Sequence, residues 1–437
     1  MLNKKLILLV GFTLIFSGLL IPFNVNAAKT ETSVQQTEIL NLEKCLASAL
    51  ENSKALQLAA KQVAQKKEAF KQARSGFLPT LKYGYLKSET DNEISTLERD
   101  EASISLEQLL YTGGALTAGY RMAKLDYEKA LEDERIAKQE LIFGVKQCYY
   151  GVWLAEQKLK VTQDSYDYMG RLYQQTKRFY DVGTKSKFEL FSVQTEWEKR
   201  KPDLIEAHNG VTKAKLKLAN LIGLPQDCIF NVEDELSQFQ LPENIILSLS
   251  VLLEEAYQKN PEMLKAQKDL EIAKNGVKKA YSGYLPTIAA SGSKSETSYE
   301  PKIIEDETTL TIAVNLSGVL FNGFKTQSEV AAAKDGKEAA EIAESKKRDD
   351  ILLSVQEALL DLEASLEKAR ASQSASNLAK ETLRMTQARY DAGMATTMDI
   401  SETQIKVDEA LIGYYKGLSD YIMALANIDK TLGRDPQ

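Results

Sequence analysis

The chain carries the same sequence landmarks twice, in the same order. Tyr180-Asp181-Val182-Gly183 returns as Tyr390-Asp391-Ala392-Gly393, an offset of 210 residues between Gly183 and Gly393. Three further pairs keep that order: Gly76-Phe77-Leu78-Pro79 with Gly283-Tyr284-Leu285-Pro286, Tyr111-Thr112-Gly113-Gly114 with Phe321-Asn322-Gly323-Phe324, and Leu221-Ile222-Gly223 with Thr431-Leu432-Gly433. Such an internal repeat requires each half to contain the same elements in the same order.

The first 27 residues have the pattern of a secretory signal peptide. Lys4 and Lys5 form a basic start, an apolar run from Leu6 to Ile21 follows, and Val25-Asn26-Ala27 is an A-x-A-like cleavage site. A permanent membrane anchor is the alternative, which the shortness of the apolar run disfavours. The mature chain is therefore expected outside the inner membrane.

The composition argues against nucleic acid as a partner and against catalysis. The formal net charge is −7, and it becomes −9 once the two lysines of the signal segment are removed. The three scattered cysteines, Cys45, Cys148 and Cys228, match neither a disulfide framework nor a thiolate metal site. His208 is the only histidine. We therefore expect no enzymatic activity, no metal and no cofactor.

One very long helix is predicted in each half. Proline is absent from 115–180, where seam residues recur at alternating intervals of four and three. The seam comprises Leu141, Val145, Cys148, Val152, Ala155, Leu159, Thr162, Tyr166, Met169, Tyr173, Thr176 and Tyr180. A second long helix is expected over 325–391, where polar Gln373 and Ser376 on the distal seam suit helices that surround solvent. Helices of about 95–100 Å must pack lengthwise against others. Cys148 is expected as a buried small residue on the seam.

Shorter helices are expected to pair with the long ones. Residues 42–74 contain no glycine or proline and favour one helix. Gly183 suits the end of the first long helix, and Ser186-Lys187-Phe188-Glu189 is a capping-box pattern that starts a return helix ending near Leu221. The same plan is expected in the second half, where the return helix ends near Leu432. Each half thus contains an antiparallel helical hairpin.

Two pairs of strands precede the long helices. After Pro79, Leu81, Tyr83 and Tyr85 alternate with polar or small residues, which indicates a strand with one apolar face. A polar stretch over 87–101 is expected to be a long loop before the second strand. The other alternating apolar positions are Ile104, Leu106 and Leu110 in the first half, and Ile288, Ala290, Leu310, Ile312, Val314 and Leu316 in the second.

These elements predict a mainly α-helical chain with a small transmembrane β part. The first repeat covers 28–225, with a β-hairpin at 77–112 and a helical hairpin at 115–222. A linker at 226–246 precedes the second repeat at 247–437, with a β-hairpin at 285–321 and a helical hairpin at 325–432. Four strands cannot close on themselves, and a membrane tolerates no open edge. Three copies would form a twelve-stranded β-barrel above a long α-helical barrel.

The duplicated Gly-aromatic-Leu-Pro junctions, the Tyr-Asp-x-Gly turns, and the helices containing Gln194 and Gln404 resemble the TolC-like outer-membrane efflux family. The resemblance covers about residues 30–434. It implies a homotrimeric duct that contacts outer-membrane lipid, has its helices in the periplasm, and docks on a periplasmic adaptor and an inner-membrane pump or ABC transporter. It implies export of small molecules or proteins, and no residue identifies the cargo. The alternative is a secreted, soluble coiled-coil adaptor, which would need no amphipathic strand pairs.

The resemblance also implies two groups of functional residues. Adaptor-contacting turns at the periplasmic tip would contain Tyr180, Asp181, Gly183, Asp391 and Gly393, and the periplasmic aperture would be lined by Glu189, Tyr390, Asp399 and Glu402. The family can carry an arginine latch where this chain has Ala395, whereas the first repeat has Lys185 at the matching position. Capping alone remains the alternative for Glu189, and a solvated helix face remains the alternative for Asp399 and Glu402.

Overall fold

Two 67-residue helices, α3 (Ala115–Asp181) and α8 (Lys325–Asp391), run the length of the helical part. The computed structural model describes residues 38–91, 96–225, 230–234, 236, 239–243, 247–302 and 305–434, so the predicted signal peptide lies outside the described residues. At 1.5 Å per residue each long helix extends about 100 Å. Such helices have to be covered along their length by other elements.

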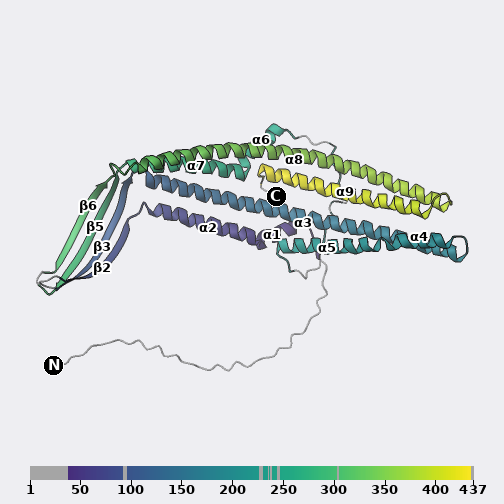
Figure 1. The fold of residues 1–437 in the computed structure, drawn as a ribbon, viewed down its shortest axis with the longest axis horizontal. Helices are drawn as coiled ribbons and strands as arrows, with labels where there is room; N and C mark the ends of the chain where they lie inside the picture. The colour runs from purple at the N-terminus through teal and green to yellow at the C-terminus, as the bar shows by residue number, and fades with distance from the viewer. Residues whose placement is uncertain are drawn as a thin grey trace, which may run out of the picture. The chain divides into compact units, whose positions relative to one another are not determined.

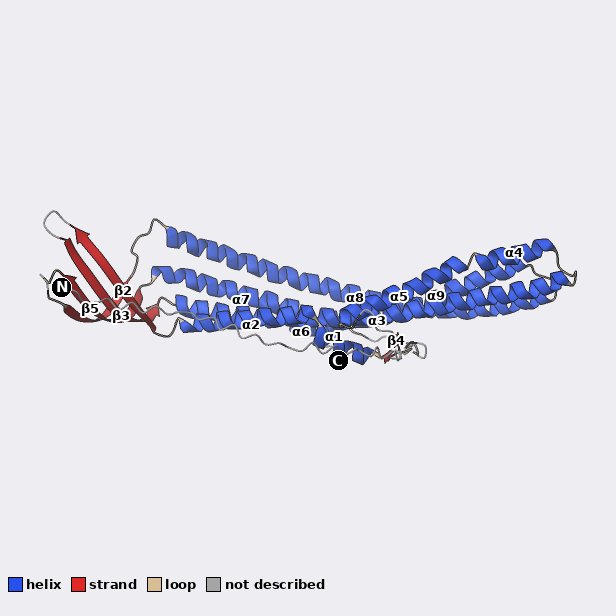
Figure 2. Cartoon of the chain, turned by 90° about the horizontal axis from the view of Figure 1, so that it is seen from below, coloured by secondary structure: helices blue, strands red, loops and turns tan. Residues whose placement is uncertain are grey.

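Shorter helices provide that cover (Figures 1 and 2). In the first half α2 packs beside the strand-proximal part of α3, and α4 and α5 pack beside its distal part. In the second half α7 and then α9 accompany α8 in the same way. The shorter helices are α1 (Leu42–Asn52), α2 (Lys54–Ser75), α4 (Lys187–Glu198), α5 (Lys201–Ile222), α6 (Leu249–Lys259), α7 (Pro261–Tyr281), the 3-10 turn η2 (Ser282–Tyr284) and α9 (Thr397–Leu432). None of the helices in the described part of the chain is both long and apolar enough to cross a membrane.

Two of the predicted helices are interrupted. The helix expected over 42–74 breaks at Ser53, which is extended and accepts a hydrogen bond from the Leu56 amide at 3.3 Å, so that it caps α2. The first return helix divides into α4 and α5. Pro202 lies in the first turn of α5 and cannot donate the backbone hydrogen bond that would continue α4. The second return helix, α9, has no such proline and is continuous.

The four long strands form one antiparallel sheet in the order β2-β3-β5-β6. Their bounds are β2 Thr80–Asp91, β3 Thr96–Thr112, β5 Thr287–Glu300 and β6 Glu307–Ser317. The prediction of a long polar loop over 87–101 is wrong, because only residues 92–95 separate β2 from β3. Cross-strand contacts hold this polar section in register, including the ion pair between Lys87 Nζ and Glu98 Oε2 at 2.8 Å. The pairing of β3 with β5 joins the two halves.

The sheet has one apolar and one polar face. Residues directly opposite in neighbouring strands share a face, so the in-register row Leu81, Leu106, Gly292 and Ile312 lies on one side. The next row, Lys82, Ser105, Ser293 and Thr311, lies on the other side. The apolar side chains are exposed in the single chain: Leu81, Tyr83, Ile104, Leu106, Leu310, Ile312, Val314 and Leu316.

The predicted linker contributes to the largest core of the described chain, although its sequence pattern does not predict this. Strand β4 (Phe230–Val232) pairs in parallel with β1 (Glu38–Leu40), and Phe230 is buried with Val145 and Tyr149 of α3. The Trp153 indole N–H donates to the carboxylate of Asp234 at 2.6 Å. A segment without clear periodicity thus covers the side of α3 near its middle.

The predicted seam of α3 is only partly correct: Leu141, Val145, Val152, Met169 and Thr176 are buried, whereas Tyr173 and Tyr180 at the distal end are half-buried. Between Val152 and Met169 the buried stripe runs through Gln157, Val161 and Ser165, whereas Ala155, Leu159 and Thr162 are half-buried. A straight helix drifts relative to a strict heptad, and a long contact stripe therefore changes register. Cys148 is also half-buried rather than buried, and burial raises the pKa of its thiol.

An ion pair joins the end of the described chain to the first helix of the second repeat. Arg434 forms a forked pair with Glu255 of α6, with its Nε at 3.1 Å and its Nη2 at 2.9 Å from the two carboxylate oxygens. This pair, with a further hydrogen bond from Lys259, lowers the pKa of Glu255 from its ordinary 4.5 to about 2. A carboxyl group with a depressed folded-state pKa stabilises the fold above its unfolded pKa. That contribution is lost as the pH falls from about 4.5 towards 2.

We expect Glu255→Gln to lower the stability of the folded chain at pH 7 by about 1 kcal/mol, the upper end for partly exposed ion pairs. The deficit should shrink as the pH falls through the interval between 4.5 and 2, because the wild-type carboxylate then also becomes neutral. Thermal unfolding of detergent-solubilised protein at pH 7 and at acidic pH measures both. Glu68→Gln, which removes an exposed ion pair with Lys71, is the control. A loss of stability that does not change with pH would contradict the lowered pKa of Glu255.

Candidate functional site: the paired helical turns

The two duplicated turns lie together at the end of the helices opposite the strands (Figure 1). Gly183 has φ +80° and Gly393 has φ +74°, the left-handed conformation that ends a helix. Their amides donate to the carbonyls of Tyr180 and Tyr390, each at 2.9 Å. No atom lies within 4 Å of where a Cβ would stand on either glycine, so backbone conformation alone demands glycine here.

Each turn leads into a capping box, and these boxes contain two of the predicted aperture carboxylates. The Ser186 amide donates to Glu189 at 3.0 Å, and the Thr396 amide donates to Asp399 at 2.7 Å. The backbone hydrogen bond from Thr396 is the main reason that the pKa of Asp399 is lowered. Capping by Glu189 was predicted, whereas that by Asp399 was missed, although the Thr-x-x-Asp spacing is its signal.

Lys185 connects the two hairpins. Its ammonium lies 2.9 Å from Glu189 Oε1 and 5.1 Å from the centre of the Tyr390 ring, which is 5% exposed. The hydrogen bond between Lys185 and Glu189 raises the pKa of the lysine and lowers that of the glutamate. Lys185 and Glu189 of the first repeat thus meet Tyr390 of the second repeat at one point.

The other predicted residues are more exposed. Glu402 lies one turn after Asp399 on α9 and pairs with Lys406 at 2.7 Å. Asp391 accepts a hydrogen bond from Gln387 at 3.0 Å, and Asp181 is exposed. Within one chain the structure therefore brings Glu189 and Tyr390 together. Asp399 and Glu402 instead lie on the surface of α9.

A small core supports both turns. Met169 and Leu172 of α3, Val193 of α4 and Ile400 of α9 pack with Tyr390. Thr176 and Tyr390 are joined by a hydrogen bond between their hydroxyls at 3.4 Å, and the Tyr168 hydroxyl donates to Gln387. Sequence reasoning missed these contacts between repeats. Across the described ranges, no three His, Cys, Asp or Glu side chains gather where they would hold a metal ion.

Comparison with known proteins places this arrangement among membrane channels. The family described as Outer membrane efflux protein matches residues 45–224 and 252–434. Outer membrane protein TolC of Vibrio cholerae is 25% identical over 422 residues, covering 95% of each chain. The Proteases secretion protein PrtF of Dickeya chrysanthemi is 23% identical, covering 75% of this chain and 74% of the relative. A crystal structure of a Pseudomonas aeruginosa membrane protein has the same fold, with a TM-score of 0.80 at 17% identity and 91% coverage of both chains.

We expect Gly183→Ala and Gly393→Ala to destabilise their turns by about 1–2 kcal/mol each, because a Cβ is strained at positive φ. Faster amide hydrogen exchange in residues 178–186 and 388–396, respectively, would report the effect. Gly210→Ala is the matched control. Gly210 lies inside α5 with open space at its Cβ position, and alanine there should stabilise by about 0.5–1 kcal/mol. Equal effects at all three positions would contradict the turn geometry.

Proposed function

Because this chain belongs to the outer membrane efflux protein family, we propose that it is the outer-membrane exit duct of a tripartite efflux or type I secretion system. The observation that carries the proposal is a sheet with an exposed apolar face at one end of two helical hairpins built on 67-residue helices. A single chain thereby combines a membrane-facing part with a periplasmic part about 100 Å long. A soluble coiled-coil adaptor would not need that sheet.

The proposed assembly is a homotrimer whose strands form a twelve-stranded barrel. Strands β2 and β6 are the edges of the four-stranded sheet in the described chain. In a membrane such edges require partners, and neighbouring copies supply them. The exposed apolar positions of β6 run from Leu310 to Leu316, which spans about 20 Å at 3.4 Å per residue. That height is comparable to the apolar band of about 25 Å on outer-membrane barrels.

The proposed role of the tip is a gated, cation-preferring entrance. Glu189, Asp399 and Glu402 would contribute three carboxylates per chain, and thus nine in a trimer, and rings of carboxylates attract cations. Lys185 would offset part of their repulsion through Glu189 and hold Tyr390 in place. The turn residues Tyr180, Asp181, Gly183, Asp391 and Gly393 would contact a periplasmic adaptor, which an inner-membrane pump or ABC transporter accompanies.

The proposed duct provides a passage for the cargo and does not change the cargo chemically. The family is one of transport proteins, and the proposed duct performs no catalysis and needs no cofactor. The partner pump would select the cargo. Efflux of small molecules and secretion of proteins are therefore both compatible with this chain.

The assembly is tested by two substitutions in adjacent residues of β6. Ile312→Arg places a charge on the apolar face and should cost about 2–4 kcal/mol in the membrane. Thr311→Arg places the same charge on the polar face and should be tolerated. Membrane extraction and chemical cross-linking of the detergent-solubilised protein measure insertion and copy number. Cross-linking should stop at three copies in the wild type and in the Thr311 variant. A limiting dimer, or equal insertion of both variants, would refute the architecture.

The entrance is tested by reversing charge on α9. Asp399→Lys with Glu402→Lys should weaken or reverse the cation preference of single channels in planar bilayers, while trimers persist. The expected shift in reversal potential follows from replacing six carboxylates per trimer by six ammonium groups. Glu381→Lys, at an exposed position of α8 paired with Arg384, is the control. An unchanged reversal potential in the double variant would mean that these carboxylates are only a solvated helix face.

A further inference from the structure

The junction between α4 and α5 distinguishes the two helical hairpins. The Arg200 amide donates to the carbonyl of Trp197 at 3.1 Å, which is the tighter i−3 spacing, and Pro202 has no amide hydrogen to donate. A short 3-10 step beside a proline weakens the helical ladder at this point. The equivalent part of the second hairpin lies inside the continuous α9. The first return helix therefore contains a preformed point of bending.

Arg200 lies at this junction and is 9% exposed. Its Nη1 donates to Ser165 Oγ of α3 at 2.6 Å and pairs with Asp408 Oδ2 of α9 at 3.2 Å. Its Nη2 donates to the Ser401 carbonyl at 3.3 Å. The Ser165 hydroxyl also donates to Asp408, which accepts a further hydrogen bond from Gln404 at 2.8 Å. One buried guanidinium thus fastens the bend to its own hairpin and to the other one.

This group, which we call the Arg200 cluster (Ser165, Arg200, Ser401, Gln404 and Asp408), occurs only once in the duplicated chain. At the offset of 210 residues, Ser165 corresponds to Ala375 and Arg200 to Ala410. Phe191 occupies the position that corresponds to Ser401. The second repeat therefore lacks both the bend and the side chains that would fasten it. The bend and Arg200 both belong to the first return helix, and Ser401, Gln404 and Asp408 of the second repeat complete the cluster.

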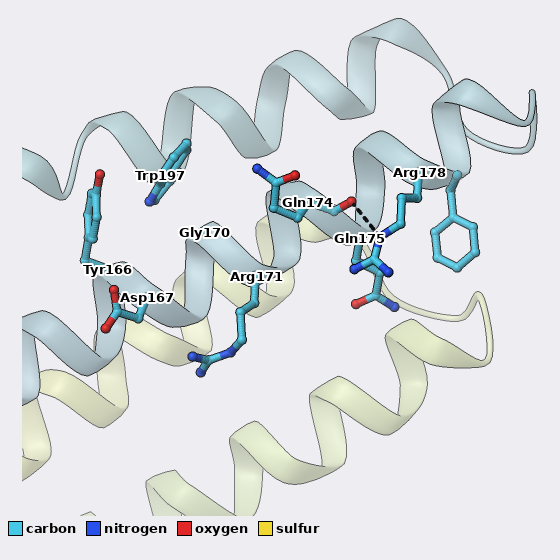
Figure 3. A pocket seen from close by; sticks show the side chains of 9 residues that line it. Tyr166, Asp167, Gly170, Arg171, Gln174, Gln175, Arg178 and Trp197 are labelled. Atoms are coloured by element: carbon cyan, nitrogen blue, oxygen red, sulfur yellow. Dashed lines mark hydrogen bonds between the residues drawn. The ribbon is translucent and has the colours of Figure 1, made fainter.

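Aromatic side chains pack together on the side of the junction that is nearer the turns. The Trp197 ring stacks on Tyr173 at 5.4 Å and lies 5.4 Å from Tyr166, all centre to centre. It covers Gly170, where a Cβ would lie 3.1 Å from the indole nitrogen (Figure 3). These contacts are all between α3 and α4. They tie α4 to α3, and a movement of α4 at the junction would uncover the Trp197 ring. The junction is tied to α9 by the Arg200 cluster and by the hydrogen bond that the Ser401 hydroxyl donates to Glu196 of α4 at 3.0 Å.

We propose that the α4–α5 junction is a hinge and that the Arg200 cluster is the catch that holds it against the second hairpin. Releasing the catch would let α4, with the first turn and Lys185, move away from α9 and Tyr390. This inference rests on the proposed function, in which the entrance at the tip is gated, and it adds that separation of the two hairpins opens that entrance. It places the control of opening about 25 Å from the turns, since Arg200 lies 17 residues after Gly183.

The test uses the full-length protein in detergent and in planar bilayers. Asp408→Asn keeps the shape of the side chain and removes its charge from the buried pair. Ser165→Ala is the milder variant, because it removes the bridging hydroxyl without leaving a charge unpaired. Both are made in a Trp153→Phe background, in which Trp197 is the one remaining tryptophan of the chain. Glu381→Gln, which breaks an exposed ion pair on α8, is the control.

In the two cluster variants we expect acrylamide quenching of Trp197 to increase about twofold, and channel openings in bilayers to become several-fold more frequent. The control should match the background protein in both measurements. Unchanged quenching in both cluster variants, with trimers intact, would overturn the hinge. Increased quenching without a change in openings would overturn the link to the entrance. If neither the wild-type protein nor the background protein forms channels, the proposed function fails, and the quenching result still decides whether the junction moves.

Discussion

A helix of about 100 Å with one apolar stripe has to be covered along its whole length, and this requirement shapes the rest of the chain. No single return helix covers α3. Helix α2, which precedes α3 in the chain, covers the strand-proximal part of α3. Helices α4 and α5, which follow α3, cover its distal part. The same solution in the second half places α7 and α9 along α8. The strands and the turns are consequently separated to opposite ends of the helices.

The polar contacts between repeats divide into two kinds. Near the middle, Arg135 of α3 donates to the Lys259 carbonyl at 3.0 Å, and Lys268 of α7 pairs with Glu132 of α3 at 3.1 Å. Nearer the turns, the polar contacts between hairpins include Lys185 over Tyr390, Arg200 with Asp408, and Ser401 with Glu196. Buried charged contacts are costly to leave half-made, so each favours one defined arrangement over a range of loose ones. The two repeats are thus joined by polar contacts both at the middle of the helices and near the turns.

Periodicity revealed the parts of the fold in which one face is buried or continuously apolar. The apolar alternation at Leu81, Tyr83 and Tyr85 predicted a strand, and the heptad seam predicted α3. The polar section of β2 and β3 has no apolar face, so its strands were mistaken for a loop. Strands β1 and β4 have three residues each, which is too short for a period to appear. In such segments the structure depends on distant partners.

The candidate site likewise contains residues that have a local sequence signal and residues that have none. Gly183 and Gly393 were recognisable because a left-handed helix end has a strong residue preference. The contact between Lys185 and Tyr390 was not, because it joins residues 205 positions apart and neither side chain has a local signal for it. Burial of Arg200 was equally hidden. A charged residue between helices is ordinarily solvated, and only the positions of Ser165 and Asp408 on other helices make its burial favourable.

The pairing of β3 with β5 also sets an order of events during biogenesis. Leu106 finds its partner at Gly292, so the first hairpin cannot complete its sheet until the second repeat has been synthesised and translocated. Contacts of such large sequence separation form slowly. The continuous four-stranded apolar surface therefore comes into being only after β6, which ends at Ser317, has been synthesised. A chain that is truncated before β6 would lack this surface, whereas one that is truncated after Ser317 would still contain its four strands.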